Sequence, residues 1–159
     1  MAENDPSSPT VEIKFASYLE WIFAIIGAVD SIAVSILFSG SQLSFPNAGI
    51  RDILPLPGLY FLEISVLGIL LVVKLYRSDP VGSFWRLLPW AGSGLLLAFV
   101  ILGALSIGIY LVPAMLSYLG LGILSDRRSG RGLGGGFGIF ILAALIQALI
   151  VYLFSILFL

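Results

Sequence analysis

The sequence predicts an all-α membrane protein, a polytopic bundle of five transmembrane helices, with four spans as the alternative. Apolar residues make up 59% of the 159-residue chain and charged residues only 11%, whereas soluble domains hold about 45–50% and about 25%. The mean hydropathy is +1.10. Several uncharged stretches are long enough to cross a hydrocarbon core of about 30 Å. Lipid, rather than water, is therefore the solvent that this composition fits.

Charge and composition also exclude several functions. The formal net charge is −1, which argues against a nucleic-acid partner, because binding phosphates requires clustered cations. The chain has no Cys and no His. Disulfides, iron–sulfur clusters and zinc–thiolate sites are therefore excluded within it, and the usual ligand of haem iron is missing. We expect no cofactor, no metal site and no catalytic residue, and hence no enzyme.

The chain begins with a predicted flexible acidic tail, residues 1–16, and a single transmembrane domain follows at residues 17–159. The tail carries Glu3, Asp5 and Glu12 and lacks the basic start of a signal peptide. Residues 17–38 then form the first predicted helix, which at 22 residues is about 33 Å long. Glycines and prolines in residues 39–57 predict a loop.

Residues 58–76 form the second predicted helix, because Pro57 fits a first turn and Lys74 can extend to the interface at the far end. The topology depends on residues 87–124, which contain no charge. A single helix of this length would be about 57 Å long, nearly twice the hydrocarbon thickness. We therefore expect a hairpin of helices at about 87–105 and 110–125, turning near residues 106–109. The last helix is predicted at about 137–159.

The distribution of basic residues favours five spans over four. With the N-terminus in the cytoplasm, five spans place seven of the eight basic residues on the cytoplasmic side and only Arg51 outside. Four spans would move three arginines outside and give four on each side. The positive-inside rule therefore predicts a cytoplasmic N-terminus and an extracytoplasmic C-terminus.

Four polar residues inside the predicted spans form the candidate intramembrane site: Asp30, Glu63, Glu20 and Gln147. Asp30 is near the centre of the first helix, where an ionised side chain costs about 2.5–3.5 kcal/mol, so it should not face lipid. In one interpretation these groups form a proton or cation path. In the other, which we favour in so small a protein, Asp30 is protonated and makes a hydrogen bond across a helix interface.

Other residues were assigned to packing and to the membrane surface. Small residues at helical spacing predict close helix contacts or a docking face for a partner: Gly92, Gly103, Ser117, Gly120, Ala144 and Ala148. The residues Arg127, Arg128 and Arg131 are candidate contacts for anionic lipid headgroups. The glycine-rich run 129–138 has no GK[ST] sequence and does not predict a nucleotide site. Aromatic residues near the span ends, Trp90 among them, are expected to anchor at the headgroups.

These features predict a non-enzymatic protein of the cell membrane, crossing it several times. The first hypothesis is a helical subunit that packs within a larger membrane complex or associates with itself. The alternative is a small proton- or cation-coupled transporter or channel that uses the intramembrane carboxylates. A membrane-embedded enzyme ranks third, because Asp and Glu alone offer little beyond acid–base chemistry. The expected partners are the lipid bilayer, other membrane subunits and a second copy, and not nucleic acid.

Overall fold

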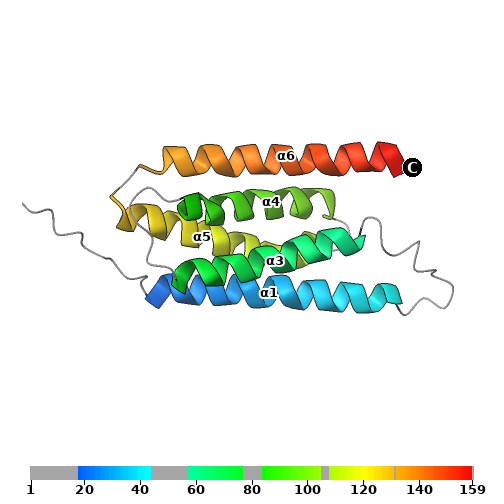
Figure 1. The fold of residues 1–159 in the computed structure, drawn as a ribbon, viewed down its shortest axis with the longest axis horizontal. Helices are drawn as coiled ribbons and strands as arrows, with labels where there is room; N and C mark the ends of the chain where they lie inside the picture. Colours follow the sequence, from blue (N-terminus) through cyan, green and yellow to red (C-terminus); the bar gives the residue numbers. More distant parts are fainter. Residues whose placement is uncertain (1–17, 44–56, 77–83, 105–107, 131, 159) are drawn as a thin grey trace, which may run out of the picture.

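The computed structural model of the chain describes residues 18–43, 57–76, 84–104, 108–130 and 132–158. These residues form five long helices and no strand (Figure 1). The helices are α1 (Tyr18–Leu43), α3 (Pro57–Tyr76), α4 (Leu88–Leu102), α5 (Val112–Arg128) and α6 (Gly134–Phe158). Two short 3₁₀ segments, η1 (Phe84–Leu87) and η2 (Gly108–Leu111), lead into α4 and α5. The predicted all-α class is confirmed.

Four of the described helical segments are long and apolar enough to cross a membrane. They are Tyr18–Phe38, Trp85–Leu102, Gly108–Arg128 and Gly134–Phe154, so the chain is a helical membrane protein. The fifth helix, α3, has 20 residues and a length of about 30 Å. That α3 also crosses the bilayer stays a prediction. The predicted acidic tail, residues 1–16, lies outside the described residues.

Successive long helices run in opposite directions (Figure 1). The first residues of α1, α4 and α6 lie at one end of the bundle, together with the last residues of α3 and α5. The final residue of α6 lies at the other end. The uncharged middle stretch is therefore bent back on itself as predicted, and the end of α5 is beside the start of α1.

Glycines form the turn between α4 and α5. The backbone N–H of Gly103 donates to the carbonyl of Phe99 (2.8 Å), and that of Gly108 donates to the carbonyl of Gly103 (2.7 Å). Helix α4 ends at Leu102, so the chain begins to turn at Gly103, slightly before the predicted residues 106–109. Pro113 lies in the first turn of α5, where its missing N–H has no partner to lose.

Three of the predicted helices were too short at one end. Helix α1 continues from the predicted residue 38 to Leu43, and α5 continues from the predicted residue 125 to Arg128. Helix α6 begins at Gly134, three residues before the prediction, because glycine does not prevent a helix whose following residues are strongly apolar. Gly130, with φ +65°, ends the preceding helix in the left-handed conformation that glycine adopts easily.

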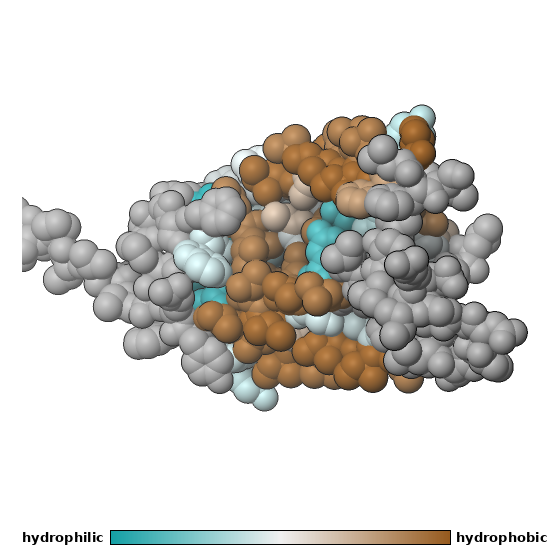
Figure 2. All heavy atoms as spheres, turned by 45° about the vertical axis from the view of Figure 1, so that its right-hand side comes forward, coloured by the Kyte–Doolittle hydropathy of each residue, from teal (hydrophilic) through white to brown (hydrophobic). Residues whose placement is uncertain are grey.

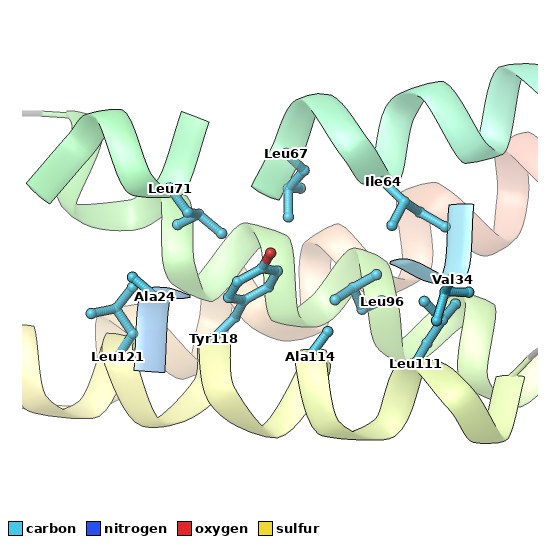
Figure 3. Packing of buried hydrophobic residues seen from close by; sticks show 10 residues of the cluster. All are labelled: Ala24, Val34, Ile64, Leu67, Leu71, Leu96, Leu111, Ala114, Tyr118 and Leu121. Carbon is cyan, nitrogen blue, oxygen red and sulfur yellow. The ribbon is translucent and has the colours of Figure 1, made fainter. Parts of the chain in front are cut away.

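The buried core is built from α1, α3, α4, η2 and α5 (Figure 3). Its members are apolar residues spaced along one face of each element: Ala24, Val34, Ile64, Leu67, Leu71, Leu96, Leu111, Ala114, Tyr118 and Leu121. Tyr118 is fully buried, and its hydroxyl is 3.0 Å from the Ser31 hydroxyl. A Cβ added at Gly27 would overlap the Tyr118 ring. Glycine at position 27 is therefore what lets α5 place an aromatic ring against α1.

None of the α6 residues whose burial is described belongs to this core, and the helix packs mainly on α4. Added Cβ atoms would overlap at two positions that are one helical turn apart, Gly94 with the Phe140 carbonyl and Gly136 with the Trp90 ring. Most of the rest of α6 is exposed and apolar, with side chains such as Leu145, Leu149 and Tyr152. Figure 2 shows the same character over much of the described surface in its view, which is mainly hydrophobic with hydrophilic residues near the middle and at the left end.

Candidate functional site

The four predicted site residues are not gathered in one place. Glu63 and Gln147 lie together: the Gln147 side-chain amide donates to the Glu63 carboxylate (Nε2 to Oε2, 3.2 Å). This hydrogen bond joins α3 to α6, which otherwise make few contacts. Asp30 and Glu20 each interact with α5 instead, at two different levels of α1.

Asp30 accepts a hydrogen bond from the first turn of α5. Its carboxylate Oδ2 is 3.1 Å from the backbone N of Ala114, one of the N–H groups that a helix cannot satisfy from within. The residue at the start of α5, Leu111, provides no side-chain cap. A carboxylate at this position also interacts favourably with the positive end of the helix dipole. Asp30 therefore caps the N-terminus of α5 from another helix, whereas a capping residue normally lies next to the helix that it caps.

Replacing Asp30 with alanine should lower the free energy of unfolding by about 0.5–2 kcal/mol, the range measured for lost N-terminal caps. Unfolding in mixed micelles, followed by circular dichroism, measures this change. The matched control is Asp30→Asn, which keeps an oxygen acceptor at the same reach and should lose less than Asp30→Ala. Equal losses in the two variants would contradict a capping role.

Glu20 forms an ion pair with Arg128. The Glu20 Oε2 and Arg128 Nη1 atoms are 2.8 Å apart, and the Glu20 side chain is almost fully buried. Arg128 therefore binds a carboxylate of its own chain, whereas the sequence suggested a lipid headgroup. Arg127 is exposed and retains that predicted role, and Arg131 lies outside the described residues. The pair joins the end of α5 to the start of α1.

This pairing predicts a cross-link at one end of the bundle. The chain has no native Cys, so a variant with both Glu20→Cys and Arg128→Cys should be joined by a short bifunctional thiol reagent. Mobility in a denaturing gel measures the product. The control pair, Leu37→Cys with Arg128→Cys, places the second thiol 17 residues further along α1, about 26 Å away, and should stay uncross-linked. The opposite pattern would overturn the helix arrangement.

A second group of charges near the same end was missed in the sequence. Asp126 is fully buried; its Oδ1 is 3.1 Å from Arg86 Nε, and its Oδ2 accepts a hydrogen bond from the indole N–H of Trp90 (3.1 Å). Lys74 is also buried, with its Nζ 3.5 Å from the Ser125 hydroxyl. The headgroup anchor predicted for Trp90 is therefore wrong, and Lys74 is packed inside the bundle instead of extending to the interface.

The burial of Asp126 could have been predicted from the spacing of residues along α5. Ala114, Tyr118, Gly122 and Asp126 follow one another at intervals of four and therefore share one helix face, and all four are buried. A carboxylate that continues a stripe of small and apolar residues faces the bundle rather than water. The predicted helix ended at residue 125, one residue before Asp126, so the prediction did not include this continuity.

Chemically, the described polar groups join helices to one another. Each of the five helices takes part in at least one contact of this kind, with α4 contributing the Trp90 indole N–H. Within the described ranges, no three His, Cys, Asp or Glu side chains are grouped to hold a metal ion.

No protein-family model, curated protein or solved structure matches the chain. Function therefore has to be inferred from the contacts of the chain itself.

Proposed function

We propose that the protein is a non-enzymatic, multi-pass integral protein of the cell membrane that serves as a helical subunit. It packs within a larger membrane complex or against a second copy of itself. One observation carries the proposal: α6 lies outside the core, packs on α4, and leaves a long apolar surface uncovered. In a membrane, helices associate by packing such surfaces closely rather than by hiding them from water.

The polar contacts support the same proposal. Glu20, Asp30, Asp126 and Gln147 each have a partner on another helix. Groups that are already engaged in holding helices together act as structural links. In this proposal the chain binds its partner subunits through its outer surface and not through a reactive site.

The test is purification of the native assembly in a mild detergent, with one change on the exposed surface. Leu145 of α6 is 64% exposed and Val29 of α1 is 62% exposed, so Leu145→Trp and Val29→Trp are matched substitutions. The wild type should elute as a complex of defined size, and Leu145→Trp should disrupt that complex while Val29→Trp leaves it intact. A wild-type protein that elutes as a monomer without companions would contradict the proposal.

A small cation-coupled transporter is the second candidate, and the position of Glu63 favours it. This carboxylate is only partly buried within an apolar helix, and its described partner, Gln147, is neutral. Flux of protons or monovalent cations into proteoliposomes that contain the purified protein distinguishes the two candidates. Flux that is abolished by Glu63→Gln, in a protein that purifies alone, would select the transporter.

A further inference from the structure

Helices α3 and α4 make few contacts with each other, so the bundle is loosely packed on the side between them. Helix α3 packs along α1, but it touches α4 at few positions. In one of these contacts Leu67 packs against Gly92, and a Cβ added to Gly92 would lie 2.9 Å from the leucine side chain. In another, the rings of Tyr60 and Phe99 have centroids 5.2 Å apart. Because α6 lies on α4, this side is a seam between α3 and α6 with α4 beneath it.

Three polar side chains meet at this seam. Gln147 of α6 is only 3% exposed and donates to Glu63 of α3, which is partly exposed. Tyr60 precedes Glu63 by three residues, so the two share a face of α3. The Tyr60 hydroxyl is buried and has no hydrogen-bond partner among the described residues. A buried hydroxyl without a partner costs about 1–3 kcal/mol, so the seam lacks a polar group that would satisfy it.

No described basic residue is near enough to balance the Glu63 carboxylate. Lys74 is eleven residues further along the same helix, about 16 Å away, and its Nζ contacts Ser125. Arg86 and Arg128 are paired with Asp126 and Glu20 at that same end of the bundle. Ionised carboxylates inside a membrane normally pair with a cation or face a polar cavity.

We propose that the seam between α3 and α6 binds a lipophilic ammonium cation that enters sideways from the bilayer. Its charged nitrogen pairs with the Glu63 carboxylate, and one of its N–H groups donates to the Tyr60 hydroxyl. The aromatic rings of Tyr60 and Phe99 add a cation–π contribution, and the apolar side chains around them accept the hydrocarbon part. This binding site goes beyond the subunit proposal and does not depend on it.

The chemistry of the seam favours an organic cation over a metal ion. Calcium takes about six to eight oxygen ligands, and magnesium requires near-octahedral oxygen geometry with several retained waters. The three side chains supply few oxygens, and one carboxylate oxygen is already used by Gln147. A monovalent ammonium needs only one carboxylate and one further acceptor. Its apolar substituents are compatible with an entrance that faces lipid.

Binding of radiolabelled tetraphenylphosphonium to the purified full-length protein, in nanodiscs of phosphatidylcholine, tests the charged part of the site. The wild type should bind the probe saturably, and Glu63→Gln should weaken binding at least tenfold. The matched control is Asp30→Asn, the same type of change in a carboxylate of another helix, and it should bind as the wild type does. Equal binding by wild type and Glu63→Gln would overturn the proposal, and so would equal losses in the two variants.

Displacement of the probe tests the hydrogen bond and needs only the wild type and one further variant. Octylammonium should displace the phosphonium from the wild type, whereas 1-octanol, which has the same chain and no charge, should not. Tyr60→Phe should weaken the binding of octylammonium at least threefold. It should leave the binding of the phosphonium unchanged, because the phosphonium has no N–H group. If Glu63→Gln does not fold, the wild-type competition decides: displacement by 1-octanol at the concentrations that suffice for octylammonium would reject a cation site.

Discussion

Replacing Asp126 with alanine should lower the free energy of unfolding by about 3–5 kcal/mol, the range expected when one partner of a buried ion pair is removed. The substitution leaves the Arg86 guanidinium without its carboxylate and the Trp90 indole N–H without its acceptor. Trp90 is buried and the Arg86 side chain is only 19% exposed, so water cannot easily replace the lost contacts. Denaturation in mixed micelles, followed by circular dichroism, measures the loss.

Two further variants separate this effect from a general loss of charge. Arg127→Gln changes the neighbouring residue, which is exposed, and should alter stability by no more than about 0.5 kcal/mol. Arg86→Met removes the cation while keeping an unbranched side chain. In a double-mutant cycle, Asp126→Ala and Arg86→Met should therefore cost less together than the sum of their separate effects. Strict additivity would mean that the two side chains do not stabilise each other.

Replacing Gly27 with leucine should destabilise the protein by about 3 kcal/mol or more, at the upper end of the range for overpacked cores. A single added Cβ at this position already overlaps the Tyr118 ring, and Tyr118 is at the centre of the buried cluster (Figure 3). The larger side chain therefore separates α1 from α5 or displaces the ring. Thermal unfolding of the purified variant in detergent measures the outcome.

The Gly27 prediction has both a control and a rescue. Gly138 has open space around its Cβ position, so Gly138→Leu places the same side chain on α6 without a clash and should leave stability nearly unchanged. Combining Gly27→Leu with Tyr118→Ala removes the ring that the leucine meets. The double variant should be more stable than Gly27→Leu alone. Failure of that rescue would show that the glycine is needed for a reason other than the Tyr118 ring.

The helices could be predicted because hydropathy and length are properties of each segment alone. The uncharged residues 87–124 are too long for one span, and the α4–α5 hairpin follows from that fact together with the glycines near its middle. The ends of α1, α5 and α6 were less accurate. Charge and glycine mark the edge of the hydrocarbon region, whereas a helix continues for as long as its backbone can be hydrogen-bonded.

The polar contacts could be predicted only in part, because they depend on which helices become neighbours. The sequence singled out Asp30, Glu63, Glu20 and Gln147 correctly as residues within helices, but their spacing could not tell that Glu63 meets Gln147 and that Asp30 meets the start of α5. Lys74 was expected to extend to the interface, and Asp126 lies one residue beyond the predicted end of the helix at 110–125. Their burial depends on α3, α4 and α5 meeting at that end, which no single segment reveals.

The isolation of α6 from the core has a consequence for how the protein is made. The ten residues of the buried cluster all precede Gly134, the first residue of α6. When the ribosome completes α5, every side chain that this cluster requires has already been synthesised. The final helix thus joins a bundle whose apolar cluster has already been synthesised, and it is held there by close glycine contacts with α4 and by the Gln147 amide, which donates to Glu63. A gene shortened after codon 133 would still encode all ten residues of the buried cluster, but it would lack Gln147, which is buried on α6.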